Sequence, residues 1–153
     1  MNKLKDQLFH QVVSELLMRS NSRVQVKIEA CFPGKRLVGG KYHMGSHTVY
    51  LYKAEIKEQC IRLFGSLDRL DEYIAVIFAH ELGHSEDKEL NELAALLDSP
   101  LSDREEAEIC LHLEKNAWRY ARCLLSHMDP LFIDHIVGES LSGYYQRLEL
   151  NTA

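Results

Sequence analysis

The feature that most constrains this chain is an apolar helix that ends in a polar motif. Residues 74–79 read Ile-Ala-Val-Ile-Phe-Ala, with apolar side chains on every face of a helix, so we expect this helix to be buried. His80-Glu81-Leu82-Gly83-His84 follows directly. Two imidazoles and a carboxylate at the end of a buried helix need polar partners, because burying them unpaired is costly.

The spacing of this motif, HExxH, suits a metal ion. His80 and His84 are four positions apart and therefore lie on one helix face, where both imidazoles can reach the same ion. Zn²⁺ is the usual occupant of such a pair. Glu81 is turned about 100° from His80, so it can contact a water beside the metal without being a ligand. This is the position of a general base.

A catalytic zinc needs a third protein ligand and an open position for water. Ser102-Asp-Arg-Glu105 has the spacing of a capping box and predicts the start of a helix that reaches about residue 127. One stripe of this helix is apolar or small except for a single carboxylate: Ala107, Cys110, Glu114, Ala117, Ala121, Leu124 and Met128. We expect Glu114 to be the third ligand, with small residues letting the two helices approach. The alternative is that the buried face of this helix is a different one, so that Glu114 is a surface glutamate.

These residues resemble the ImmA/IrrE-type zinc metallopeptidases, a group of zincins. After the HExxH motif, their second helix carries Glu-x-x-Ala-[Asn/Asp]-x-aromatic-Ala. Here Glu114, Ala117, Tyr120 and Ala121 fit, and Trp118 stands where the family has Asn or Asp. The resemblance covers about residues 68–125.

The resemblance implies a cytoplasmic zinc endopeptidase with a compact zincin-like architecture. Its zinc ligands would be His80, His84 and Glu114, and Glu81 would be the general base. Known relatives act on transcriptional repressors, so the implied partner is a protein or peptide substrate such as a repressor or regulator.

A peptidase also needs a group that stabilises the oxyanion and a surface that holds the peptide. We favour His127 as the group that stabilises the oxyanion, because it follows the Glu114 helix; Tyr120, His135, Tyr144 and Tyr145 are the alternatives. Residues 48–52 alternate in character and are rich in β-branched and aromatic side chains, so they predict a strand. If it lies at a sheet edge, an extended peptide can pair with it.

The remaining patterns predict an α+β fold in which a small N-terminal sheet packs on a mainly helical half. We expect one domain over residues 1–153. We expect strands at 23–28 and 48–52 with a short third strand between them. We expect helices at 3–19, 56–64, 68–85, 88–98 and 102–127, and a last helical region from Pro130 that is interrupted near Gly138 and Gly143.

Composition narrows the class of protein. The net charge of −5 disfavours direct nucleic-acid binding, and no stretch has the ~20 apolar residues of a membrane span. Residues 1–20 predict an amphipathic helix and not an export signal. The four cysteines (Cys31, Cys60, Cys110, Cys123) form no CxxC pair, so we expect reduced thiols in a cytoplasmic protein.

Two other classes of function compete with the peptidase. The chain could be a non-catalytic zincin-fold protein that binds a regulatory partner. Trp118 favours this class, because it stands where the family has Asn or Asp, and the retained Glu81 disfavours it. It could also be a metal-free interaction domain whose histidines only cap a helix. Metal content separates the last class from the other two.

Overall fold

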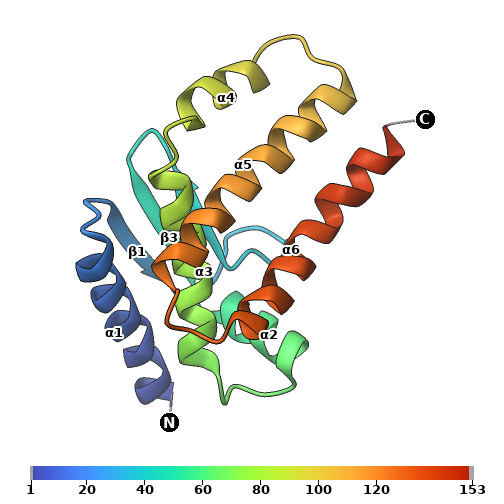
Figure 1. Cartoon of the computed structure of the whole chain (residues 1–153). Helices are drawn as coiled ribbons and strands as arrows, with labels where there is room; N and C mark the ends of the chain where they lie inside the picture. Colours follow the sequence, from blue (N-terminus) through green and yellow to red (C-terminus); the bar gives the residue numbers. More distant parts are fainter. Residues whose placement is uncertain (1, 152–153) are drawn as a thin grey trace.

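The computed structural model describes residues 2–151 and confirms the α+β class. The helices are α1 (Asn2–Ser20), α2 (Lys53–Phe64), α3 (Leu70–Ser85), α4 (Leu90–Leu97), α5 (Asp103–Leu124) and α6 (Pro130–Leu150), and the strands are β1 (Gln25–Glu29), β2 (Gly40–His43) and β3 (Thr48–Tyr52). Figure 1 shows α3 running through the middle of the molecule, with α1 on one side and α5 and α6 on the other.

The three strands form one mixed sheet in the order β1-β3-β2. β1 is parallel to β3, and β2 is antiparallel to it. The expectation that residues 48–52 form an edge is therefore wrong: β3 is the central strand, and four of its five residues are buried. Alternation and β-branching predicted the strand but carry no information on how many neighbours it has. The expected third strand is β2, which lies at an edge and packs against α3.

Helix α3 is the centre of the core, as its apolar composition predicts. Ten of its residues are buried, among them Ile74, Val76 and Phe78. The sheet, α1, α2 and α5 all pack on it. A helix that is apolar on every face is stable only when neighbours surround it. The motif at its C-terminal end is therefore held by a rigid element.

The contact between α3 and α5 is unusually close. A Cβ atom built on Gly83 would lie 2.4 Å from the backbone oxygen of Ala117 and 2.8 Å from its Cα. Both residues are fully or almost fully buried. The two helix backbones therefore meet at the small residues that the sequence pattern singled out. This approach brings the next turn of α5, which carries Glu114, up to the motif on α3.

Local signals explain where two of the helices end or begin. Gly65 follows α2 with φ at 78°, and its N–H donates to the Ile61 carbonyl at 2.8 Å. This left-handed conformation strains residues other than glycine. At the start of α5 the Ser102 hydroxyl accepts from the Glu105 N–H, and the Glu105 carboxylate accepts from the Ser102 N–H. The predicted capping box is confirmed.

The predicted interruption of the last helix is wrong, because α6 is continuous from Pro130 to Leu150. Asp129 caps its first turn, and Phe132, Ile133 and Ile136 are buried in the core. A glycine inside a helix costs only about 1 kcal/mol. Tertiary packing therefore offsets the two glycines, Gly138 and Gly143, and the helix carries its later residues over the motif.

Two further expectations concern membrane-spanning helices and the state of the cysteines. Within residues 2–151, none of the helices combines the length and the apolar character that crossing a membrane requires. All four cysteines are free; Cys60 is buried, Cys110 is half-buried, and the other two are exposed.

The Gly83 contact predicts an asymmetry between two helical glycines. Gly83→Ala should lower the free energy of unfolding by about 1–3 kcal/mol, because the new methyl group overlaps the Ala117 backbone. Gly138→Ala is the matched control: apart from the nearby backbone of its own helix, nothing lies within 4 Å of the new Cβ, so it should raise stability by about 0.5–1 kcal/mol. Urea denaturation measures both changes. Equal effects would show that the close approach is not a constraint.

Candidate metal centre

The two histidines and Glu114 meet between α3 and α5. Nε2 of His80 lies 3.0 Å from one carboxylate oxygen of Glu114, and Nε2 of His84 lies 3.3 Å from the other. The two imidazole rings are 4.7 Å apart and nearly perpendicular. The three side chains are only 12–15 % exposed. The structure thus brings together the three residues that the sequence proposed as ligands, with both Nε2 atoms facing the carboxylate.

This group fits a metal ion in its donor chemistry. His80, Glu81 and His84 each offer one donor atom, and these atoms lie within 4.8 Å of one another. Glu114 adds a carboxylate that already contacts both imidazole nitrogens. Two imidazole nitrogens with one carboxylate oxygen are a common donor set for catalytic zinc. We take Glu114, and not Glu81, as the third donor, because its two oxygens are the ones that face both Nε2 atoms.

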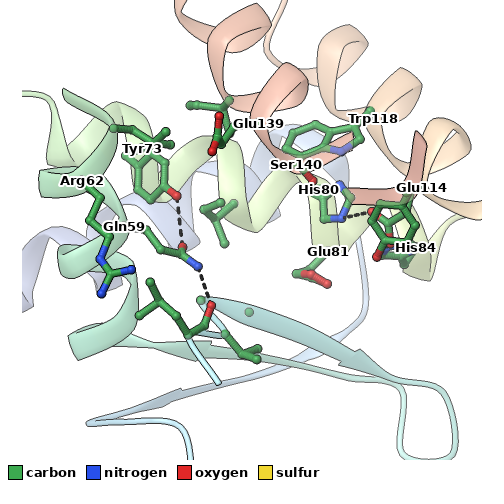
Figure 2. Close-up of a pocket in the computed structure, with 18 residues that line it drawn as sticks. Gln59, Arg62, Tyr73, His80, Glu81, His84, Glu114, Trp118, Glu139 and Ser140 are labelled. Carbon is green, nitrogen blue, oxygen red and sulfur yellow. Dashed lines mark hydrogen bonds and ion pairs between the residues drawn. The ribbon is translucent and has the colours of Figure 1, made fainter. Parts of the chain in front are cut away.

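Glu81 lies beside the donors and faces the sheet. It is only 6 % exposed, and a Cβ built on Gly40 of β2 would lie 3.1 Å from its Cγ. Burial raises the pKa of the Glu81 carboxyl, an effect that the nearby His80 and His84 partly oppose. Figure 2 shows Glu81 pointing toward the strand while His80 and His84 gather at Glu114. A carboxylate in this position can exchange a proton with a group held between α3 and β2.

The pKa values of Glu114 and His84 reflect their pairing. Burial raises the pKa of Glu114, but the hydrogen bonds from His80 and His84 outweigh it and leave that pKa well below the usual range. Burial lowers the pKa of His84, but the hydrogen bond with Glu114 and the negative charges of Glu81, Glu114 and Asp87 together outweigh it and leave the pKa raised. In the absence of metal, both shifts therefore favour the partly buried ion pair between protonated His84 and ionised Glu114.

A cleft runs across this group. Its larger part has a volume of about 530 Å³ and extends toward α2, and its smaller part has a volume of about 300 Å³ and extends toward the start of α4. The residues shared by the two parts come from β2, α3, α5 and α6: Gly40, Glu81, His84, Glu114 and Tyr144. The two parts thus adjoin at the motif, with the edge strand β2 along both.

Hydrogen bonds at the far end of the larger part fix the segment that enters β2. The Tyr73 hydroxyl donates to Oε1 of Gln59 at 3.0 Å, and Nε2 of Gln59 donates to the Leu37 carbonyl at 2.9 Å (Figure 2). Gly39 packs so closely here that a Cβ would lie 2.6 Å from Oε1 of Gln59. The backbone on this side of the cleft is therefore anchored to α2 and α3.

His127, the favoured oxyanion group, is not part of the cleft. It lies beyond the end of α5, is exposed, and its ring hydrogen-bonds with Arg19 of α1. Of the alternatives, Tyr144 does line both parts of the cleft. Burial and the neighbouring Glu114 raise the pKa of the Tyr144 phenol to about 12, so it remains a hydrogen-bond donor at neutral pH.

The other three alternatives also lie outside the cleft lining. Tyr120 packs at the border of the core, His135 packs against Phe64, and Tyr145 is exposed beneath Lys115. The place of His127 after the Glu114 helix therefore does not bring it to the cleft. The signal for Tyr144 is its place on a continuous α6, which the predicted interruption had hidden.

Two more residues of the site were not predicted as such. The Gly39-Gly40 pair reads as a turn, but Gly40 begins β2 and lets its backbone approach Glu81. Trp118 reads as a departure from a family pattern, but its ring lies against His80 with the centroids 4.1 Å apart. A pair of glycines beside a strand pattern is a usable signal of close backbone approach.

Comparisons with protein-family models, with curated proteins and with solved structures found no match to this chain. The resemblance to ImmA/IrrE-type metallopeptidases thus rests on the residues of the two motifs, and the functional argument rests on the geometry of the site.

The ion pair predicts a pH-dependent stability of the metal-free protein. The contribution of Glu114 is present above the ordinary carboxyl pKa of 4.5 and is lost as the pH falls through its lowered folded value. The contribution of His84 is present below the ordinary imidazole pKa of 6.5 and is lost as the pH rises through its raised folded value. The pair therefore stabilises the fold most between these two ordinary values.

Glu114→Gln should accordingly destabilise the metal-free protein by about 1–3 kcal/mol near pH 6 and by less near pH 9. Urea denaturation in the presence of a chelator measures the difference. Glu108→Gln on the exposed face of α5 is the control and should have little effect at either pH, because Glu108 only pairs with Arg104 at the surface. An equal loss for Glu114→Gln at both values would contradict the ion pair.

Proposed function

We propose that this chain is a cytoplasmic, zinc-dependent endopeptidase that hydrolyses a specific protein substrate, such as a transcriptional repressor or regulator. One observation carries the proposal: His80, His84 and Glu114 converge on one point, and Glu81 lies beside them in a cleft along an edge strand. The resemblance to ImmA/IrrE-type enzymes supports the class of substrate.

His80, His84 and Glu114 would hold the metal, through Nε2 of each imidazole and the carboxylate. When bound, zinc acidifies a water molecule and polarises the carbonyl of the scissile peptide bond. The three ligands are held on two packed helices whose backbones touch at Gly83 and Ala117. This rigidity favours a constant ligand geometry, which efficient catalysis requires.

Glu81 is the proposed general base and acid. Its carboxylate accepts a proton from the attacking water and then delivers it to the nitrogen of the leaving amine. Burial raises the pKa of Glu81, which makes its carboxylate a better proton acceptor than an exposed one. Acid–base catalysis of this kind accelerates reactions by roughly 10²–10⁴-fold.

The substrate would bind as an extended segment along β2. This strand pairs with β3 on one side only, so its other side can form backbone hydrogen bonds with a peptide. Gly40 brings the β2 backbone next to Glu81, so a paired peptide would pass directly over the proposed base. The smaller part of the cleft, lined by Met44, Leu90 and Leu113 among others, offers space for an apolar side chain.

Tyr144 is the proposed donor to the developing oxyanion. Its protonated phenol lies on α6 at the junction of the two parts of the cleft and beside Glu114. A hydroxyl placed there can donate to the carbonyl oxygen as negative charge accumulates. In this proposal Tyr144 takes the role that the sequence had suggested for His127.

A second candidate function is a zincin-fold protein that binds a regulatory partner without cleaving it. The observation in its favour is Trp118, an apolar ring against His80 where related enzymes have a polar residue. The presence of the buried carboxylate Glu81 disfavours it, because a binding protein has no need of a base. The two candidates differ in whether the zinc-loaded protein hydrolyses peptides.

Replacing the proposed base gives the direct test. Glu81→Gln should lower the rate of peptide hydrolysis by about 10²–10⁴-fold and leave one zinc bound per chain. A proteome-derived peptide mixture with mass-spectrometric detection measures cleavage, and elemental analysis measures zinc. Glu86→Gln, at the exposed end of α3, is the control and should keep full activity. Full activity of Glu81→Gln would refute the assignment.

The role of Tyr144 has its own test. Tyr144→Phe should reduce kcat by about 10²-fold with little change in KM, because the phenol acts on the transition state. Tyr145→Phe is the neighbouring control and should be neutral, since Tyr145 is 43 % exposed. Steady-state kinetics on a peptide found in the mixture measures both. A change confined to KM would indicate a role in substrate binding alone.

A further inference from the structure

Trp118 lies against one of the proposed zinc ligands. It is on the same face of α5 as Glu114, one helical turn further along, and is only 3 % exposed. Its ring centroid lies 4.1 Å from that of His80, and the two planes are inclined by 34° (Figure 2). The indole therefore covers one face of the imidazole.

One nitrogen of each ring has no partner among the described residues. Nδ1 of His80 and Nε1 of Trp118 are both buried, and neither forms a hydrogen bond with any of residues 2–151. If Nε2 of His80 binds a metal, the ring proton sits on Nδ1, where it has no acceptor. Metal-binding histidines usually donate this proton to a carboxylate or a carbonyl, which fixes the ring orientation. At His80 no such hydrogen bond is present.

We propose that Trp118 is a positioning residue for the metal site, which fixes the plane of His80 by ring stacking in place of a hydrogen bond at Nδ1. This inference rests on the proposed metal-binding function. Stacking also acts on affinity: an imidazole bound to a cation becomes electron-poor, and the electron-rich face of an indole attracts it. Trp118 thus favours the metal-bound state of His80 over the metal-free one.

The first test uses the fact that Trp118 is the only tryptophan of the sequence. Addition of Co²⁺ to the metal-free full-length protein should quench tryptophan emission and saturate at one equivalent, in step with the visible absorption of the bound ion. His84→Ala should abolish the quenching at the same Co²⁺ concentration. Saturable Co²⁺ absorption without quenching would overturn the stacking arrangement.

The second test separates the aromatic face from simple filling of space. Competition with a chromophoric chelator measures zinc affinity for the wild type, Trp118→Phe and Trp118→Leu. We expect the order wild type, Phe, Leu, with Leu weaker than wild type by about 10–100-fold and Phe recovering most of the loss. Leu125→Val, a change at the buried C-cap residue of α5, is the control and should leave zinc affinity unchanged. Equal affinities for Phe and Leu would overturn the proposal.

A third test changes the electron density of the Trp118 indole and retains its shape. Growth on fluorinated tryptophan changes this one position only, and each added fluorine withdraws electron density from the indole face. Zinc affinity should fall as fluorination increases, even if Trp118→Leu does not fold. An unchanged affinity would overturn the proposal. If the wild type binds neither Zn²⁺ nor Co²⁺, the proposed function fails; if it binds one ion and these changes have no effect, only the role of Trp118 fails.

Discussion

The close approach of α3 and α5 is the constraint on which the site depends. Gly83 has no side chain, so the backbone of Ala117 can lie where a Cβ would otherwise be. Glu114 is one turn earlier on α5, and this contact places its carboxylate 3.0 and 3.3 Å from the two imidazole nitrogens. A larger residue at position 83 would force the helices apart and separate the two halves of the donor set.

The same approach concentrates ionisable groups where water is scarce. Glu81 is buried, and the side chains of Glu114 and the two histidines beside it are only 12–15 % exposed. Pairing between His84 and Glu114 offsets part of the desolvation cost, whereas Glu81 has its pKa raised. Arrangements that are unfavourable for stability but favourable for proton transfer or metal binding are expected at functional sites. The surrounding core, centred on α3, holds them in place.

The cleft depends on residues that are far apart in the sequence. Gly40 comes from an edge strand, Glu81 from the central helix, Glu114 from α5 and Tyr144 from the last helix. The strand order β1-β3-β2 leaves one side of β2 unpaired, and Gly40 at its start lies next to Glu81. The Tyr73–Gln59–Leu37 hydrogen bonds anchor the segment before it. A peptide that pairs with β2 would therefore bind to a backbone that is already held in place.

The sequence alone predicted most of the helices and strands and the three side chains that meet between α3 and α5. Apolar composition identified the buried helix, the i, i+4 rule paired His80 with His84, and a single charged residue in an apolar stripe identified Glu114. The structure brings these three side chains together, and each inference depends on short-range helical geometry. The capping box at Ser102 was predictable for the same reason.

Only the tertiary structure decided which strand is the edge, whether α6 continues past its glycines, and which side chains complete the cleft. Alternation in residues 48–52 cannot reveal that β3 has two neighbours, and glycine content cannot reveal that core packing of Phe132 and Ile136 sustains α6. His127 was favoured for its place after α5, but Tyr144 reaches the site because α6 folds back over α5. Local propensities extend over a turn or two of chain, whereas these choices depend on contacts between segments far apart in the sequence.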